Sequence, residues 1–128
     1  MSKPRVLDVG QCDPDHASIR RMLESKFGAQ VVRVADGEQA AAELAKGKFD
    51  LVLVNRKLDI DYSDGMEIVR RVVGLPDEQR PPIMLVSNYP EYQEEAVKAG
   101  AAYGFGKAEL TDPRVHDRLR PFLAPTSA

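Results

Sequence analysis

Side chains capable of chemistry are concentrated in residues 10–13, 55–64 and 87–88 and in the single residue Lys107. They offer carboxylate and amide oxygens for a cation, hydroxyl and thiol groups, and one ammonium group. No glycine-rich loop accompanies them, because residues 10–12 match neither the dinucleotide-binding pattern nor the P-loop pattern. A nucleotide-binding enzyme is therefore disfavoured.

The loop from Asp59 to Gly65 begins like a calcium-binding EF-hand loop. However, Asp64 stands where that loop needs glycine, and Arg70 stands where a glutamate completes the ligand set. We therefore expect a polar loop in which Asp64 caps the helix that follows.

Cys12 is the single cysteine of the chain and cannot form an intramolecular disulfide, which fits a reducing, cytoplasmic compartment. A position near a helix N-terminus lowers a thiol pKa, so a redox-sensing thiol is one interpretation. A small packing residue is the other, because free cysteines are commonly buried. His16 and His116 have no neighbouring cluster of metal ligands, and we expect both at the surface.

Apolar runs alternate with helical patterns along the chain, which is typical of parallel β/α construction. The expected strands are residues 5–9, 30–34, 49–54, 83–86 and 102–105. The expected helices are residues 14–27 with Asp13 as N-cap, 38–45, 65–73, 91–99, and a last helix opened at 111–113 and cut short by Pro121. Right-handed crossovers then give a doubly wound, five-stranded parallel α/β sheet with its ligand site at the carboxyl ends of the strands.

Length and charge limit the class of protein further. The 128 residues fit one domain, expected at 4–123 with a frayed tail at 124–128. The 18 basic and 20 acidic residues give a net charge of −2, so we expect no nucleic-acid partner. No apolar run approaches the roughly 20 residues of a membrane span, and we expect no membrane contact.

The order of these features resembles the response-regulator receiver domain of two-component signalling, over about residues 4–123. The resemblance rests on Asp13-Pro14-Asp15-His16, on the run 49–54 closed by Asn55, on Ser87, and on Ala99-Gly100-Ala101 ahead of Lys107. It implies a flavodoxin-like (β/α)5 fold, a role in a phosphorelay and a bacterial source. It also implies that a carboxylate after the third strand accepts a phosphoryl group, helped by Mg²⁺ on an acidic pair, by a hydroxyl and by a lysine.

Several of those positions depart from the family pattern. The phosphoacceptor falls on Asn55, whose amide oxygen is a poor nucleophile without charge. The acidic pair falls on Gln11 and Cys12, which leaves Asp13 as the nearby acid. Each carboxylate that is missing at about 4 Å from a cation reduces the electrostatic attraction for that cation by roughly 1–4 kcal/mol per unit of its charge. We therefore expect weak or absent Mg²⁺ binding and no other metal or cofactor.

The remaining phosphate-contacting positions of the family correspond to Ser87 and Lys107. We expect Ser87 to satisfy loop backbone groups. Lys107 either hydrogen-bonds the Asn55 oxygen or is a solvated cation. Gly104 stands where the family has its switch aromatic, an aromatic side chain ahead of the lysine. Ala108 replaces the proline that follows the lysine in the family. The loop after Asn55 is also longer than the family pattern.

These departures predict a stand-alone pseudo-receiver that is not an enzyme and acts by protein–protein interaction, independently of phosphorylation. A histidine kinase, an effector or a second copy of the chain would be its partner. The resemblance places the contact face on Tyr89, Tyr92, Tyr103, Phe105 and Arg118, residue types common at protein contacts. Two alternatives stay open, namely a displaced phosphoacceptor at Asp59 or Asp61 and a redox sensor at Cys12.

Overall fold

Five apolar segments form the sheet predicted from the sequence. In the computed structural model, which describes residues 3–123, they are β1 (Arg5–Val9), β2 (Gln30–Val34), β3 (Leu51–Asn55), β4 (Ile83–Val86) and β5 (Ala102–Phe105). All pairings are parallel and the strand order is β2-β1-β3-β4-β5. The predicted fold class is therefore confirmed. Every residue of β3 is buried, as a central strand covered on both faces requires.

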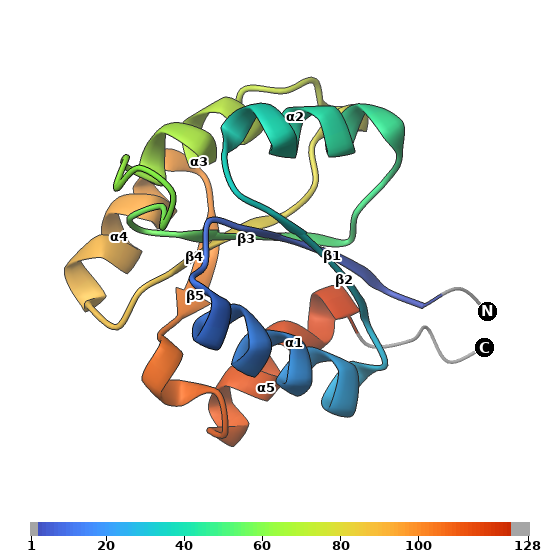
Figure 1. Ribbon diagram of the computed structural model, residues 1–128, viewed down its shortest axis with the longest axis vertical. Coiled ribbons are helices and arrows are strands. Elements are labelled where there is room, and N and C mark those ends of the chain that lie inside the picture. Colours follow the sequence, from blue (N-terminus) through green and yellow to red (C-terminus); the bar gives the residue numbers. More distant parts are fainter. Residues whose placement is uncertain (1–2, 124–128) are drawn as a thin grey trace.

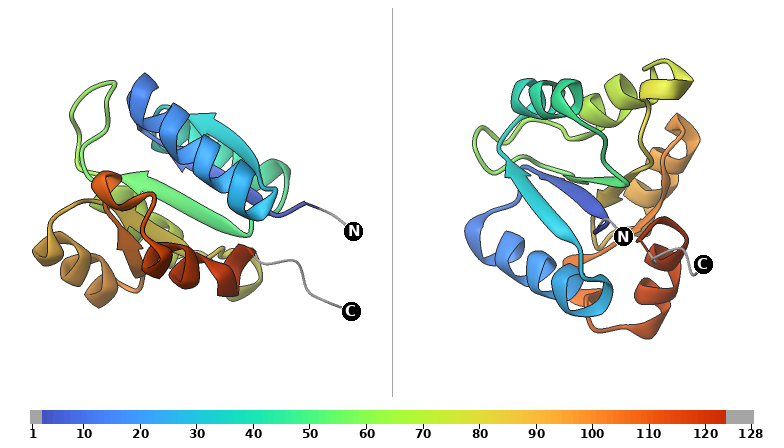
Figure 2. Two further views of the ribbon diagram at one scale, coloured as in Figure 1. Left: turned by 90° about the horizontal axis from the view of Figure 1, so that it is seen from below. Right: turned by 90° about the vertical axis from the view of Figure 1, so that its right-hand side faces the viewer.

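Five helices cover the two faces of this sheet (Figure 1). They are α1 (Asp13–Phe27), α2 (Gly37–Lys46), α3 (Met66–Val73), α4 (Pro90–Ala99) and α5 (Pro113–Leu123), and two 3₁₀ turns occupy Asp77–Gln79 and Lys107–Glu109. Helices α1 and α5 lie side by side on one face (Figure 2), while α2, α3 and α4 pack on the other. None of the described helices is long and apolar enough to cross a membrane.

Several helix ends differ from the prediction by one or two residues, and two of these differences have a clear physical reason. Cys12 is the N-cap of α1, and Asp13 is already the first helical residue. Pro121 lies inside α5, which continues to Leu123. A proline this near the end of a helix removes only one backbone hydrogen bond, and the burial of Leu119 and Leu123 holds the last turn against the sheet. The predicted frayed tail at 124–128 lies outside the described residues.

The strand order places a topological switch between β1 and β3. After β1 the chain turns outward to β2, and it then crosses to the other side of β1 to form β3. The loops after β1 and β3 therefore diverge, which opens a crevice at the carboxyl ends of these strands. Asn55 ends β3 at this point, and Gly10 follows β1 beside it.

Candidate functional site

Asn55 uses its side chain to join the ends of β1 and β3. The side chain is buried, and its Nδ2 donates a hydrogen bond to the Gly10 carbonyl oxygen at 3.1 Å. The same carbonyl accepts the backbone N–H of Asp59 at 2.9 Å. A carboxylate in the place of Asn55 would have no proton to donate here. The amide therefore has a structural role that an ionised aspartate could not perform.

The loop from β3 to α3 folds back over Gly10. Leu58 is 2% exposed, and a Cβ on Gly10 would lie 2.3 Å from its Cδ2. Gly10 also has a φ of +79°, so both the backbone conformation and the close packing favour glycine.

The acids of this loop lie at its surface or at the start of α3. Asp59 and Asp61 are exposed, and Asp61 accepts the Ser63 N–H at 2.9 Å. Hydrogen bonds from the Ser63 hydroxyl and amide lower the pKa of Asp61. Asp64 accepts the Met66 N–H at the start of α3, which agrees with a capping role, although the N-cap residue itself is Gly65. Within residues 3–123, no hydrogen bond or ion pair joins Asp59 or Asp61 to Asn55.

The equivalents of the family's acidic pair are a buried carboxamide and a half-buried thiol. Gln11 is 3% exposed, and both polar atoms of its carboxamide lack a hydrogen-bond partner. Cys12 is half-buried with a free thiol. Asp13 points toward β2, where its carboxylate pairs with Arg33 at 2.6 Å, and Arg33 also donates to the Gln11 carbonyl oxygen. No cluster of three or more His, Cys, Asp or Glu suited to a metal ion occurs in the described part of the chain.

Lys107 does not hydrogen-bond Asn55, and it is not a cation surrounded only by solvent. Its Nζ forms an ion pair with Asp15 at 2.7 Å, so both sequence-based expectations for this lysine were wrong. Partial burial raises the pKa of Asp15, but hydrogen bonds from Lys107 and Cys12 together outweigh it and hold that pKa below its usual value. Asp15 was not among the predicted site residues, although it lies one turn from the loop that they form.

Ser87 and Asn88 organise the loop after β4. The Ser87 hydroxyl oxygen accepts the Tyr89 N–H at 3.2 Å, as predicted for a residue that satisfies loop backbone groups. Asn88 Oδ1 accepts the Ala108 N–H at 3.1 Å and so ties this loop to the one that carries Lys107.

The sequence analysis missed a buried pair beneath the site. Asp8 is fully buried in β1, and its Oδ2 lies 2.6 Å from Nδ1 of His16 on α1. Burial raises the pKa of Asp8, while His16, and more weakly Gln11 and Arg33, lower it; the net result is a raised pKa. The signal was present, because an acid inside an apolar strand needs a buried partner.

Both histidines are buried, so their predicted surface positions were wrong. His16 turns inward to meet the carboxylate of Asp8, and His116 places Nε2 2.8 Å from the Leu110 carbonyl oxygen. In each case a polar partner inside the fold replaces the solvent that we expected to satisfy the ring.

Four of the five predicted contact residues are at least partly exposed on or beside α4, β5 and α5, whose joint surface is called the α4–β5–α5 face below. Tyr89 and Tyr103 are 59% and 43% exposed, Tyr92 is half-buried, and Arg118 lies over the Tyr103 ring at 5.0 Å. Phe105 is 1% exposed and packs in the core, so its assignment to this face was wrong. An irregularity in β5 between Ala102 and Phe105 breaks the alternation that would have put Tyr103 and Phe105 on one side.

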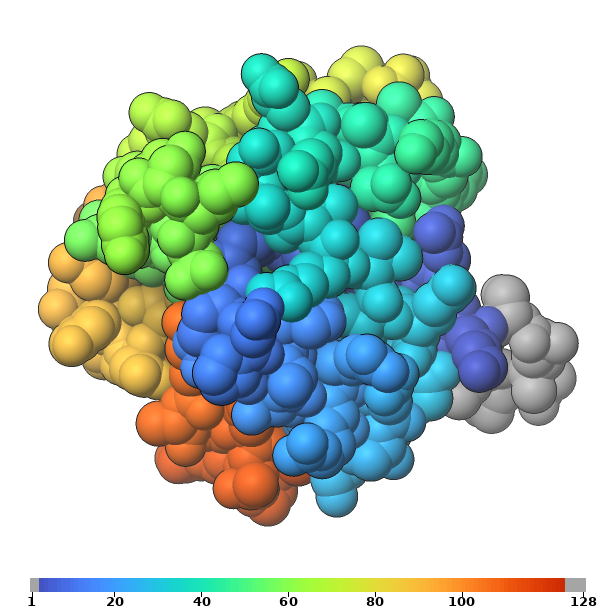
Figure 3. All heavy atoms as spheres, in the orientation of Figure 1, coloured from blue at the N-terminus to red at the C-terminus, as the bar shows by residue number. Residues whose placement is uncertain are grey.

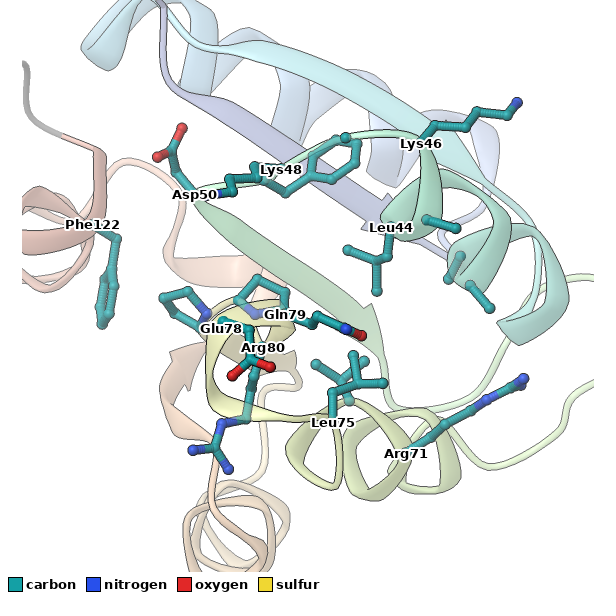
Figure 4. Close-up of a pocket in the computed structure, with 18 of the residues that line it drawn as sticks. Leu44, Lys46, Lys48, Asp50, Arg71, Leu75, Glu78, Gln79, Arg80 and Phe122 are labelled. Atoms are coloured by element: carbon teal, nitrogen blue, oxygen red, sulfur yellow. The ribbon is translucent and has the colours of Figure 1, made fainter.

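A cavity of about 910 Å³ lies away from these residues. It is bounded by α2, the start of β3, the segment from α3 to β4, and the end of α5. In Figure 4, Leu44 and Leu75 lie near its centre, whereas Lys46 points away. None of its lining residues is a predicted site residue. A smaller cavity of about 240 Å³ borders Gly10, Arg33 and Asp59, where the loops after β1, β2 and β3 meet (Figure 3).

The comparisons with known proteins agree with this geometry. A model of the response regulator receiver domain matches residues 14–119. Sporulation initiation phosphotransferase F of Bacillus subtilis (strain 168) is 30% identical over 112 residues, which cover 85% of this chain and 88% of that protein.

Solved structures show the same fold. A putative response regulator from Chloroflexus aurantiacus has a TM-score of 0.72 at 23% identity, covering 92% of this chain and 98% of that one. The receiver domain of a sensor histidine kinase from Pseudomonas aeruginosa, with magnesium in its active-site cleft, has a TM-score of 0.68 at 23% identity, covering 95% and 98%.

Proposed function

Because this chain belongs to the response regulator receiver domain family of two-component signalling, we propose that it acts there as a cytoplasmic pseudo-receiver. It signals by protein–protein interaction and neither accepts a phosphoryl group nor catalyses a reaction. The observation that carries this proposal is the hydrogen bond from the Asn55 amide to the Gly10 carbonyl. The position that would need a nucleophilic oxygen is instead a buried donor.

The charges around Asn55 support the same proposal. Phosphoryl transfer needs cations at the developing charge on the phosphoryl oxygens. Lys107 is already paired with Asp15. Asp13 is paired with Arg33 of β2. Each of these pairings would have to break before the lysine or the acids could serve a phosphoryl group.

The residues present do not fit the Mg²⁺ ion that receiver chemistry uses. Mg²⁺ prefers near-octahedral oxygen ligands that include one or two carboxylates. Here the positions of the acidic pair hold the neutral Gln11 and Cys12, and the Asn55 amide presents a donor toward the Gly10 carbonyl. The proposed function therefore has no step that runs through a metal ion.

The α4–β5–α5 face is the contact surface in this proposal. Receiver domains interact with histidine kinases and effectors, and such a protein is the proposed partner. Tyr89 and Tyr103 offer exposed aromatic area, and the Arg118 guanidinium stacks on Tyr103. Tyrosine and arginine are among the side chains that most often dominate binding energy at protein interfaces.

Intact mass measurement tests the absence of phosphorylation. The chain is incubated with acetyl phosphate and Mg²⁺, with the Bacillus subtilis relative as a parallel control. We expect no adduct on this chain. A gain of about 80 Da that hydroxylamine removes would show an acyl phosphate and overturn the proposal. Mapping that adduct to Asp59 or Asp61 would identify a displaced acceptor.

Binding of matched tyrosine variants tests the contact face. The chain is titrated against the histidine kinases and effectors of its source organism without a phosphoryl donor. Tyr103→Ala should weaken any binding about tenfold or more, because Tyr103 is an exposed aromatic on the proposed face. Tyr62→Ala, at an aromatic that is 73% exposed on the loop after β3, should leave it unchanged. An equal loss in both variants would contradict the assignment.

A further inference from the structure

The ladder between β4 and β5 is interrupted at one point. Met84 pairs with Ala102 and Val86 pairs with Phe105, so a single β4 residue faces two β5 residues. This is the two-against-one count of a β-bulge, and a bulge leaves backbone groups without ladder partners. The groups in question belong to Leu85 on β4 and Gly104 on β5.

The side chain of Gln93 satisfies these groups. Gln93 lies on α4, is 2% exposed, and inserts its carboxamide at the bulge. Its Nε2 donates to the Leu85 carbonyl at 2.8 Å and to the Ser87 carbonyl at 3.2 Å. Its Oε1 accepts the Gly104 N–H at 2.8 Å. One buried side chain therefore connects α4 to both β4 and β5.

Gly104 joins this connection to α5. The Arg118 guanidinium donates to the Gly104 carbonyl oxygen while it stacks on the neighbouring Tyr103. The N–H of Gly104 is thus held from α4 and its carbonyl from α5. A Cβ at position 104 would lie 2.0 Å from the Leu85 carbonyl oxygen, so no larger residue fits this arrangement.

We propose that Gln93 is a positioning residue that fixes the α4–β5–α5 face in one conformation. It acts through the backbone N–H of Gly104. Gly104 stands at the position that corresponds to the switch aromatic of the receiver family. The bulge turns Tyr103 outward and Phe105 inward, and the carboxamide of Gln93 keeps the bulge closed. This inference rests on the proposed function in one respect, since a receiver that binds partners without phosphorylation needs its face formed beforehand.

Hydrogen exchange of the ¹⁵N-labelled chain tests this role in Gln93→Leu. Leucine is similar in size and helix propensity, but it leaves the Gly104 N–H and two carbonyls without partners. We expect the Gly104 amide to exchange about tenfold to a hundredfold faster, relative to the amides of β1 and β3. We also expect millisecond relaxation dispersion confined to α4, β5 and their flanking loops.

A control variant and three contrary outcomes make this test specific. Glu94→Leu places the same side chain on the exposed neighbour of Gln93 and should leave Gly104 exchange unchanged. Equal acceleration of all protected amides in Gln93→Leu would show a merely global loss of stability and overturn the proposal. Unchanged Gly104 exchange, or an effect as large in Glu94→Leu, would overturn it as well.

Gln93→Glu separates the two halves of the connection. Its carboxylate still offers an oxygen to the Gly104 N–H but directs negative charge at the carbonyls of Leu85 and Ser87. Protonation at low pH supplies a donor again, so the chemical shifts of α4 and β5 should return toward those of the native chain. Shifts that already match the native chain at neutral pH would contradict the role of the Nε2 donor.

The two proposals fail in distinguishable ways. An acyl-phosphate adduct in the mass measurement would refute the proposed function and leave the exchange results standing. Unchanged exchange at Gly104 would remove the role of Gln93 and leave the argument from Asn55 intact, because neither exchange nor relaxation requires a phosphoryl donor or a partner.

Discussion

Replacing Asn55 by aspartate restores the family's acid but should destabilise this chain. The side chain is 9% exposed, and its Nδ2–H is bonded to the Gly10 carbonyl. In Asn55→Asp at neutral pH a carboxylate oxygen would face that carbonyl, and Lys107 would still be paired with Asp15. Loss of a buried hydrogen bond plus an unpaired buried charge predicts a loss of about 2–4 kcal/mol in the free energy of unfolding.

The loss should depend on pH with a definite sign. Burial raises the pKa of the introduced carboxyl above the unfolded value of about 3.9. Its contribution to stability is then fully present below that value. This contribution to stability is lost as pH rises through the folded pKa. The total loss is about 1.4 kcal/mol for each unit by which the folded pKa exceeds the unfolded pKa. The protonated form also regains a donor for the Gly10 carbonyl. The difference from the native chain should therefore be small at about pH 4 and largest above neutrality.

Urea denaturation across this pH range measures the effect. Asn88→Asp is the matched control, because Asn88 is exposed and serves as an acceptor to the Ala108 N–H, which a carboxylate can also do. Repeating the series with about 10 mM Mg²⁺ asks whether the new acid creates a metal site, which would appear as added stability. The reasoning is refuted if Asn55→Asp is as stable as Asn88→Asp above neutrality, or if Mg²⁺ stabilises it by about 1 kcal/mol or more.

Three further changes probe the surroundings of this position by urea denaturation. Asp8→Asn removes a fully buried carboxyl whose raised pKa makes the stability of the native chain fall as pH rises above about 3.9. The variant should lack this fall, whose slope is at most about 1.4 kcal/mol per pH unit. An unchanged slope would contradict the raised pKa of Asp8. Gly10→Ala should cost about 1–3 kcal/mol, because φ is +79° and the new methyl group meets Leu58; a neutral result would disprove that packing. Lys107→Met should cost less than about 1 kcal/mol, since its partner Asp15 is about one-third exposed, and a larger loss would show that the pair is more than a surface ion pair.

The order of the elements and the position of Asn55 could be predicted from local patterns. Alternating apolar runs and helical stripes depend on neighbours along the chain, so strands and helices were placed to within a few residues. The apolar run that becomes β3 ends at Asn55, and parallel strands gather their carboxyl ends at one edge. The site residues Asn55, Ser87 and Lys107 could therefore be assigned to this edge from the order of residues alone.

Tertiary structure decided what each of these side chains does. Local sequence does not show that Asn55 donates to Gly10, or that Lys107 selects Asp15. These partners come from distant segments, and only strand register and helix packing bring them within hydrogen-bond distance. The partners of Asp8 and Gln93 were missed for the same reason, although a polar residue on a buried surface signalled that a partner must exist.

Phe105, which the family resemblance assigned to the contact face, shows most plainly what only the folded structure decides. Residues two apart on a regular strand share a face, so Tyr103 and Phe105 should both have faced solvent or both the core. One extra residue in β5 reverses that relation, leaving Tyr103 exposed and burying Phe105. A bulge depends on how two strands pair and on which side chain fills the gap between them. That information belongs to the folded molecule and is not contained in either segment by itself.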